Sequence, residues 1–232
     1  QDVIDYLNSL SNLGALKIDQ CVQKEAFRNP QAPFTTSSLQ QEASRRCGFS
    51  VTQTMRLAQS LYEAGHITYM RTDSVHLAQD AIDQAKQFIL NSYGPEYSNS
   101  KQYQSKSKGA QEAHEAIRPS QFSLEAVDIG PSENKLYQLI RNRALSSQMT
   151  PAKLAKTEAS LSIGNYNFVS KGEIITFKGF LALDTSAMGK DQLLPKLVKG
   201  DDVFLEMLEA KEKVTRHPAR FTEASLVRRL EE

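Results

Sequence analysis

The stretch SVTQTMRLAQSLYEAGHITYM, residues 50–70, decides how the chain is expected to fold. Ser50 and Gln53 form the capping pattern with which helices begin, and Gly65 stands where a helix ends in a left-handed residue. The apolar residues between them recur at the spacing of one helix face: Val51, Met55, Ala58, Leu61 and Tyr62. The run HITYM that follows, residues 66–70, is typical of a short strand, which therefore carries Tyr69 away from a helix.

Three further helices are predicted from similar signals, over residues 37–48, over residues 78–93, and from just after Pro131-Ser132 to near Thr150. In the first of them Ser37 and Gln40 form a capping box, and Gly48 stands at the helix end. Two short helices joined by a tight glycine turn and followed by a short strand resemble a winged helix-turn-helix.

The sequence on both sides of this helical block has β character. Apolar and polar side chains alternate over residues 16–22, which predicts a strand with one wet face. The alternation returns at residues 159–163 and 166–176, on either side of the turn Gly164-Asn165, and at residues 203–207. The order β, α, β predicts an α+β fold in which a helical, winged-helix-like domain is inserted into a discontinuous β-rich domain.

The predicted domains are residues 1–28 with 156–212 for the β-rich domain, 29–155 for the helical domain, and 213–232 for the start of a following domain. The chain begins with Gln1 and not with Met, and a helical pattern is still running at Glu232. We therefore expect a piece of a longer protein.

The composition argues against several classes of protein. The net charge is +1, from 28 basic and 27 acidic residues, whereas a protein that coats DNA is usually far more basic. Cys21 and Cys47 stand alone, without the C-x-x-C spacing of a zinc site or the pattern of a disulfide scaffold. No apolar run approaches the roughly 20 residues of a membrane span, and no secretory signal opens the chain. A protein of the reducing cytosol is expected.

Tyr69 and Arg71 are the residues that point to chemistry. In a strand, side chains two residues apart lie on the same face, so the spacing brings a phenol beside a guanidinium. A free tyrosine has a pKa of about 10, and its attack on a phosphodiester needs a charge that stabilises the phenolate and the developing phosphorane. Arginine suits this role because it stays charged and donates two parallel hydrogen bonds. From this pair alone, packing beside a solvated cation is the commoner alternative.

Four motifs occur in the chain: PFTTSSLQQEA at residues 33–43, GHITYMRTDS at 65–74, QEAHEAIRP at 111–119 and ARFTEASLV at 219–227. Together and in this order they resemble the signatures of the type IA DNA topoisomerases, and those of bacterial topoisomerase I most closely. The resemblance spans nearly the whole chain, and four separated motifs in order leave little room for chance.

The resemblance implies roles for individual residues. Tyr69 matches the tyrosine that attacks DNA and retains its 5′ phosphate, and Arg71 matches the arginine that contacts the scissile phosphate. His114 matches a histidine close to the tyrosine, which serves either proton transfer or positioning. Without the motif, a surface or capping histidine is the commoner fate. Asp73 and Thr72 are expected to support this network.

Arg71, Arg118 and Ser74 are the residues expected to contact DNA. Other basic side chains that either reach the DNA backbone or remain solvated cations are Lys106, Lys108, Arg45 and Arg46. For the two arginines, a solvated helix end that complements the helix dipole is the favoured alternative.

The resemblance also implies the reaction, an ATP-independent transesterification. The tyrosine cleaves one strand through a 5′-phosphotyrosine intermediate, another strand passes, and religation relaxes negative supercoils. In the family the helical domain is a lid that carries the tyrosine, and the β-rich domain is the arch of a toroid. Mg²⁺ is expected in the full enzyme, on an acidic N-terminal module absent from this chain. The chain itself has no D-x-D-x-E cluster and is expected to hold no metal or cofactor.

The expected partner is DNA, in a single-stranded segment of a negatively supercoiled duplex. No membrane partner is expected, and the protein is predicted to be a cytoplasmic, nucleoid-associated monomer. The isolated chain is not expected to relax DNA. The alternatives are a DNA-binding or gating module without chemistry of its own, and a purely structural, interaction-only segment.

Overall fold

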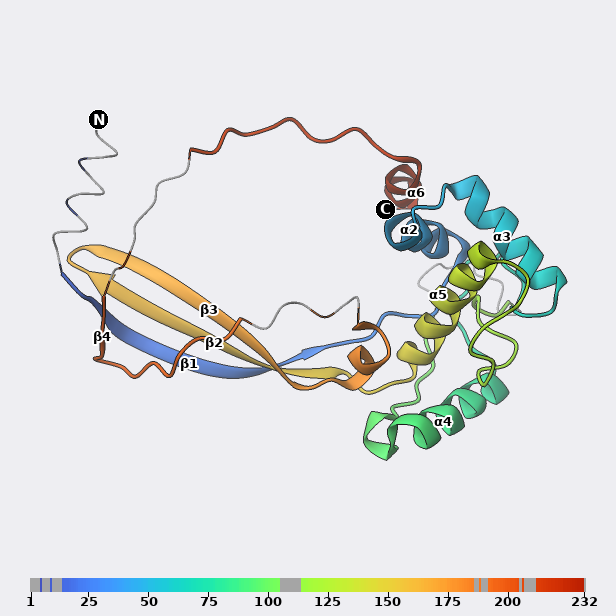
Figure 1. The fold of residues 1–232 in the computed structure, drawn as a ribbon, viewed down its shortest axis with the longest axis horizontal. Helices are drawn as coiled ribbons and strands as arrows, with labels where there is room; N and C mark the ends of the chain where they lie inside the picture. Colours follow the sequence, from blue (N-terminus) through green and yellow to red (C-terminus); the bar gives the residue numbers. More distant parts are fainter. Residues whose placement is uncertain are drawn as a thin grey trace. The chain divides into compact units, whose positions relative to one another are not determined.

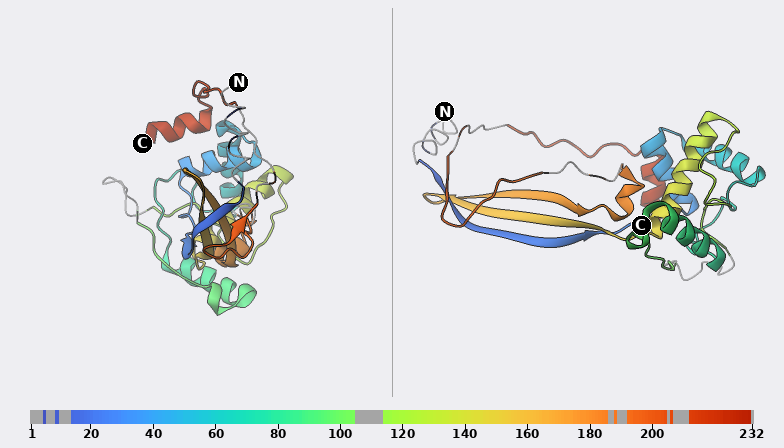
Figure 2. Two further views of the ribbon diagram at one scale, coloured as in Figure 1. Left: turned by 90° about the vertical axis from the view of Figure 1, so that its left-hand side faces the viewer. Right: turned by 60° about the horizontal axis from the view of Figure 1, so that its bottom comes forward.

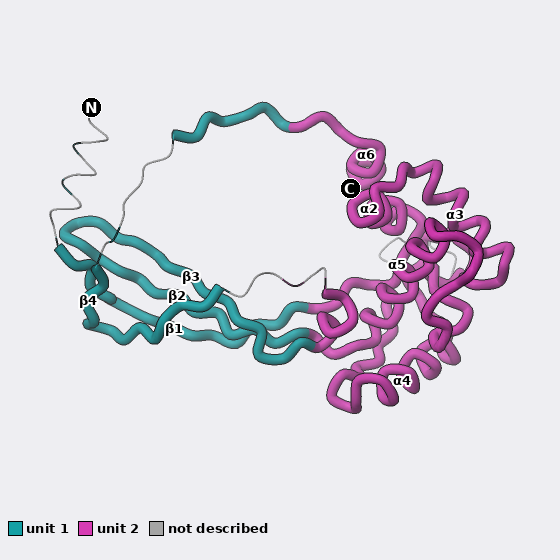
Figure 3. Tube along the Cα trace, viewed as in Figure 1, with its two compact units in different colours: residues 1–28, 152–178, 189–218 teal, residues 29–151, 179–188, 219–232 magenta. Residues whose placement is uncertain are grey.

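The computed structural model describes residues 5, 9, 14–104, 114–185, 188, 192–204, 206 and 212–231. The chain divides into two compact units, which Figure 3 shows in different colours. The first unit consists of residues 1–28, 152–178 and 189–218, and the second of residues 29–151, 179–188 and 219–232. The assignment of arch and lid roles to parts of the chain stays a prediction.

One antiparallel sheet with the strand order β3-β2-β1-β4 forms the first unit (Figure 1). The strands are β1 (Leu16–Arg28), β2 (Ala152–Ile163), β3 (Tyr166–Phe177) and β4 (Asp202–Val203). β1 and β2 pair along almost their whole length, from Lys17 with Ser162 to Arg28 with Ala152. The tight turn between β2 and β3 requires a left-handed residue, which Gly164 supplies with a φ of 56°.

Five buried side chains of this sheet follow the alternation that the sequence predicts. They form one cluster of Leu16, Ile18, Ala159, Leu161 and Ile163. β1 continues beyond the predicted end at Val22 to Arg28. β4 contains Val203, whereas Leu205 and Met207 of the predicted strand lie outside the described residues.

The second unit is helical. Its elements are α2 (Thr36–Cys47), α3 (Val51–Glu63), α4 (Gln79–Tyr93), α5 (Pro131–Ser147) and α6 (Glu223–Glu231), with the 3-10 helices η1 (Pro95–Tyr97) and η2 (Gly179–Ala182). Leu39 of α2, Leu61 of α3, and Leu136 and Ile140 of α5 are buried in one core with Phe34. α6 lies against α2 (Figures 1 and 2). The predicted combination of helices with a β-rich part is confirmed, while the winged-helix comparison stays a prediction.

The predicted capping box of α2 is wrong. The N-cap is Thr35, whose hydroxyl accepts a hydrogen bond from the N–H of Ser38, and the Ser38 hydroxyl accepts one from the N–H of Thr35. The pair Ser37 and Gln40 lies two residues too far along the chain, inside the helix. Runs of Ser and Thr offer several capping registers, and the sequence alone does not choose among them.

The predicted inner face of α3 is wrong in part. The helix buries Thr54, Leu57, Ala58 and Leu61, whereas Tyr62 is 41% exposed. Its other predicted inward residues, Val51 and Met55, are half-buried.

The predicted strand over residues 66–70 is also absent. In place of a continuous β-ladder, these residues make one isolated β-bridge, between Ile67 and Pro119. Their backbone groups find partners in other segments, as when the N–H of Thr68 donates to the carbonyl of Arg118 at 3.0 Å. An extended segment with dispersed hydrogen bonds has the sequence pattern of a strand without belonging to a sheet.

Candidate active site around Tyr69

The segment that carries Tyr69 is extended, with alternating exposure. The exposed residues are Tyr69, Arg71 and Asp73. The two residues between them, Met70 and Thr72, are buried. Met70 is 1% exposed and Tyr69 is 48% exposed, so the chain is anchored by one side chain while the next remains in solvent. The predicted common face of Tyr69 and Arg71 therefore arises from extended backbone rather than from a β-sheet.

Thr36, the first residue of α2, holds this segment in place. Its Oγ1 lies 2.8 Å from the carbonyl oxygen of Met70 and 3.1 Å from that of Thr72, and it accepts a hydrogen bond of 2.8 Å from the N–H of Thr72. The N–H of Thr36 also donates to the Thr72 carbonyl at 2.9 Å. The first motif therefore positions the residues on both sides of Arg71.

Thr68 joins the same segment to the third motif. Its hydroxyl donates to the carbonyl of Ala116 at 2.7 Å and accepts from the N–H of Arg118 at 3.0 Å. The N–H of Ile117 donates in turn to the carbonyl of Phe34 at 2.8 Å. Three motifs that are far apart in the sequence thus form one hydrogen-bonded unit around Tyr69.

A hollow of about 330 Å³ lies at this junction. The residues that line it are Tyr62, Thr68, Tyr69, Arg71, Thr72, His114 and Glu115. All three predicted catalytic residues, Tyr69, Arg71 and His114, therefore line one pocket together with Thr72. Asp73 does not line it.

Tyr62 and Glu115 are pocket residues that the sequence did not predict. The ring of Tyr62 lies edge-to-face with that of Tyr69, with centroids 5.2 Å apart and an interplanar angle of 64°. Oε1 of Glu115 accepts a hydrogen bond of 2.6 Å from the N–H of Ala78, the N-cap of α4. Position in the third motif was the only available signal for Glu115, and Tyr62 was misassigned to the buried face of its helix.

The two other residues predicted to contact DNA are engaged inside the protein. Arg118 donates to the carboxylate of Glu115 through Nη2 at 2.8 Å and through Nε at 3.2 Å, and to the carbonyl of Pro119 through Nη1 at 3.0 Å. Ser74 is buried, and its hydroxyl accepts a hydrogen bond of 3.1 Å from the N–H of His76. Their DNA contacts stay predictions, and Lys106 and Lys108 lie outside the described residues.

The two arginines in the last turn of α2 form ion pairs, and Arg45 is also exposed to solvent, as the favoured alternative predicted, whereas Arg46 is half-buried. Arg46 makes two hydrogen bonds to Asp184, at 2.8 and 2.9 Å, and Arg45 makes two to Glu42, at 2.9 and 2.6 Å. Arg143 of α5 reaches the same Glu42 carboxylate at 3.4 Å. Burial acts to raise the pKa of Glu42, but the hydrogen bond from Arg45 and the charges of the other arginines outweigh it and lower the pKa.

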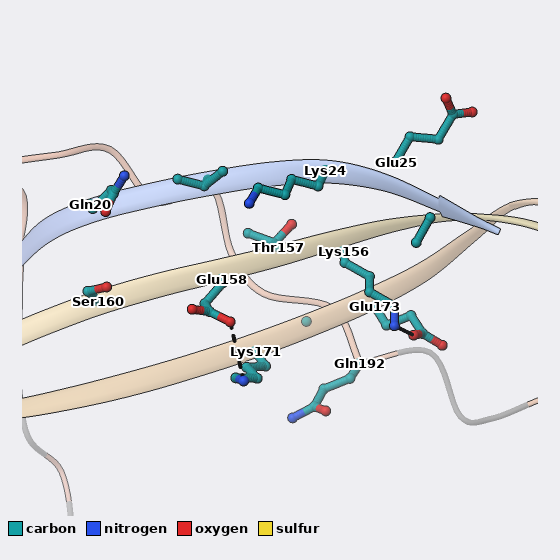
Figure 4. A pocket seen from close by; sticks show the side chains of 13 residues that line it. Gln20, Lys24, Glu25, Lys156, Thr157, Glu158, Ser160, Lys171, Glu173 and Gln192 are labelled. Atoms are coloured by element: carbon teal, nitrogen blue, oxygen red, sulfur yellow. Dashed lines mark ion pairs between the residues drawn. The ribbon is translucent and has the colours of Figure 1, made fainter. Parts of the chain in front are cut away.

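A larger hollow of about 790 Å³ lies over the sheet of the first unit (Figure 4). Four of the charged residues that line it form ion pairs, Lys156 with Glu173 at 3.4 Å and Lys171 with Glu158 at 3.3 Å. It contains none of the predicted site residues. The smaller hollow is the better candidate, because size alone provides no chemistry.

Within the described residues, no three His, Cys, Asp or Glu side chains gather in a way that could hold a metal ion. Magnesium in the full enzyme stays a prediction. The helices of the described part are all too short or too polar to cross a membrane.

Comparisons with known proteins agree on one family. A sequence model described as DNA topoisomerase matches residues 1–232. DNA topoisomerase 1 of Pseudomonas aeruginosa is 45% identical over 209 residues, which cover 87% of this chain and 24% of that protein. DNA topoisomerase 1 of Vibrio cholerae is 45% identical over 236 residues, which cover 98% and 27%. This chain spans about a quarter of the length of these relatives.

A solved structure gives the same result. Full-length topoisomerase I from Thermotoga maritima matches with a TM-score of 0.86 at 30% sequence identity. The match covers 98% of this chain and 39% of that one.

Proposed function

This chain belongs to the DNA topoisomerase family, as its four motifs predicted, and we propose that it carries the DNA-cleaving tyrosine of a type IA enzyme. In this proposal Tyr69 attacks a phosphodiester in a single-stranded segment of a negatively supercoiled duplex. A 5′-phosphotyrosine link conserves the bond energy, and the free 3′ hydroxyl reverses the step after strand passage. Supercoils relax without ATP.

The observation that carries the proposal is the shared pocket of Tyr69, Arg71 and His114. The phenol supplies the nucleophile, and the guanidinium supplies the fixed charge that a phosphorane requires. Both side chains are exposed, so a DNA strand can reach them without displacing the core. His114 borders the same space and either moves the phenol proton or positions the phosphate.

The rest of the reaction depends on parts of the enzyme outside this chain. The chain spans about a quarter of its relatives' length, and we propose that Mg²⁺ binds to an acidic N-terminal module. That ion would neutralise phosphate charge near the tyrosine. The helical unit would then act as the lid, the sheet unit as part of the arch, and the isolated chain would not relax DNA. A monomeric enzyme of the bacterial cytoplasm completes the proposal.

The alternative is a DNA-binding or gating module without chemistry of its own. Two half-exposed tyrosine rings, Tyr62 and Tyr69, favour it, because aromatic faces can stack on unpaired bases. It requires no covalent bond to DNA.

Covalent trapping separates the two. The chain is mixed with end-labelled single-stranded DNA and Mg²⁺, with and without the N-terminal module of the enzyme, and then quenched with detergent. We expect a protein–DNA adduct that requires both the module and Tyr69, and its loss in Tyr69→Phe with nearly unchanged DNA affinity. No adduct in any mixture, together with a large loss of affinity in Tyr69→Phe, would support the binding module instead.

A further inference from the structure

We propose that Tyr62 is a positioning residue whose ring holds the ring of Tyr69 in its reactive orientation. The inference rests on the proposed function, because the orientation of Tyr69 affects catalysis only if Tyr69 is the nucleophile. The observation behind it is the edge-to-face contact of the two rings, with centroids 5.2 Å apart, on the wall of the pocket that Arg71 and His114 also line.

The backbone of Tyr62 is fixed by the end of α3. The neighbouring Leu61 is fully buried, and its carbonyl accepts a hydrogen bond of 2.9 Å from the N–H of His66. The carbonyl of Tyr62 itself accepts one of 2.9 Å from the N–H of Gly65. The ring of Tyr62 is therefore attached to a rigid helix end.

The backbone of Tyr69 is fixed independently, through the burial of Met70 and the hydrogen bonds of Thr68. Two side-chain torsions of Tyr69 then remain to be set. The Tyr62 ring restricts them from one side, and edge-to-face contact is a favoured aromatic geometry. Because nucleophilic attack depends steeply on alignment, restricting these torsions before DNA binds increases the reactive fraction.

Tyr62 differs from a tyrosine that serves the core. Tyr137 is completely buried, and its hydroxyl donates to the carbonyl of Leu124 at 2.8 Å. Tyr62 remains 41% exposed and turns part of its ring toward the pocket that contains Tyr69. Core packing alone therefore does not account for the place of Tyr62 on the wall of this pocket.

The first test measures the orientation directly and without DNA. Tyr69 is replaced by 3-fluorotyrosine in the full-length protein. Its fluorine resonance is recorded in three proteins: one with the native Tyr62, one with Tyr62→Phe and one with Tyr62→Ala. We expect the resonance in Tyr62→Ala to move toward that of free fluorotyrosine, because a neighbouring ring current is lost, and the Tyr62→Phe resonance to stay close to the native one. An identical resonance in all three proteins would overturn the proposal.

The second test measures the chemistry, by single-turnover cleavage of a single-stranded oligonucleotide at several concentrations. We expect Tyr62→Ala to lower the maximal cleavage rate by roughly tenfold with little change in the half-saturating concentration, and Tyr62→Phe to restore most of the rate. The matched control is Tyr93→Ala, which removes one ring of the pair Tyr93 and Tyr97, with centroids 5.9 Å apart, at the end of α4 and outside the pocket.

The outcomes distinguish the inference from the proposed function. A raised half-saturating concentration with an unchanged maximal rate would assign Tyr62 to DNA stacking, and equal losses in Tyr62→Ala and Tyr93→Ala would assign it to general stability. Either result overturns the positioning role. If no protein forms the covalent adduct, the native one included, the proposed function fails, while the fluorine resonance still decides whether Tyr62 holds Tyr69.

Discussion

The hydroxyl of Thr36 lies 2.8 Å from the carbonyl oxygen of Met70, the residue next to Tyr69. The hydroxyl oxygen of Thr36 also accepts a hydrogen bond from the N–H of Thr72, so one side chain bonds to the backbone on both sides of Arg71. The position of the tyrosine segment is thereby tied to the first turn of α2, which begins at Thr36. A helix terminus is a rigid support, and this one serves the candidate site.

Thr36→Val is expected to weaken both the fold and the site. Valine keeps the shape of threonine but leaves the N–H of Thr72 without its partner, which costs about 1–3 kcal/mol for a buried group. Urea denaturation should show this loss, and oligonucleotide cleavage should slow as the Tyr69 segment loosens. The matched control is Thr52→Val at an exposed position of α3. Equal stability of the two variants would show that the Thr36 hydroxyl does not hold the segment.

Arg71→Lys is expected to lower cleavage while DNA binding changes little. Lysine keeps the positive charge but loses the planar fork that donates two parallel hydrogen bonds to a phosphate. We expect the cleavage rate to fall by about 100- to 1000-fold, the scale of one lost transition-state donor. Arg56→Lys, an exposed arginine of α3 outside the pocket, is the control. A native rate in Arg71→Lys would mean that charge alone suffices.

Local patterns were predictable from the sequence, and contacts between distant segments were not. The alternation around Leu161 predicted β2, and the spacing of Tyr69 and Arg71 predicted their common side. The roles of Thr36 and Glu115 depend on partners more than 30 residues away, at Met70 and Ala78. From the sequence, a threonine at the start of a helix is predicted only to cap that helix. No local pattern shows to which distant carbonyl its hydroxyl donates a hydrogen bond.

Arg118→Ala is expected to reduce stability, because Arg118 is a buried residue paired with Glu115 at 2.8 Å. The side chains of the pair are 11% and 26% exposed, so its removal leaves a half-buried carboxylate, at a cost of about 1–3 kcal/mol. Chemical denaturation measures this loss of stability, and Glu115→Gln should show a smaller loss.

The salt dependence of DNA affinity tests the contact between Arg118 and DNA that was predicted from the sequence. The loss of one phosphate contact reduces the slope of log affinity against log salt concentration by about 1. An unchanged slope would show that Arg118 stabilises the fold and does not contact DNA.

The network around Glu42 predicts a dependence of stability on acid. The pKa of Glu42 in the folded protein is lowered from its ordinary value of 4.5, against the effect of burial, by the hydrogen bond from Arg45 and the charges of Arg46 and Arg143. A lowered folded pKa means that the unfolded chain takes up the proton first as pH falls. The stabilisation is therefore complete above pH 4.5 and is lost as the pH falls from there through the folded pKa.

Glu42→Gln tests this sign directly. At neutral pH the variant should be less stable than the native protein, because it removes a carboxylate that pairs with three arginines. Between pH 6 and pH 3 its melting temperature should fall less than that of the native protein, so the two curves converge. The matched control is Glu63→Gln, which replaces an exposed carboxylate at the end of α3. A melting temperature of Glu42→Gln that falls with pH as steeply as that of the native protein would show that the carboxylate of Glu42 does not link α2 to the arginine of α5.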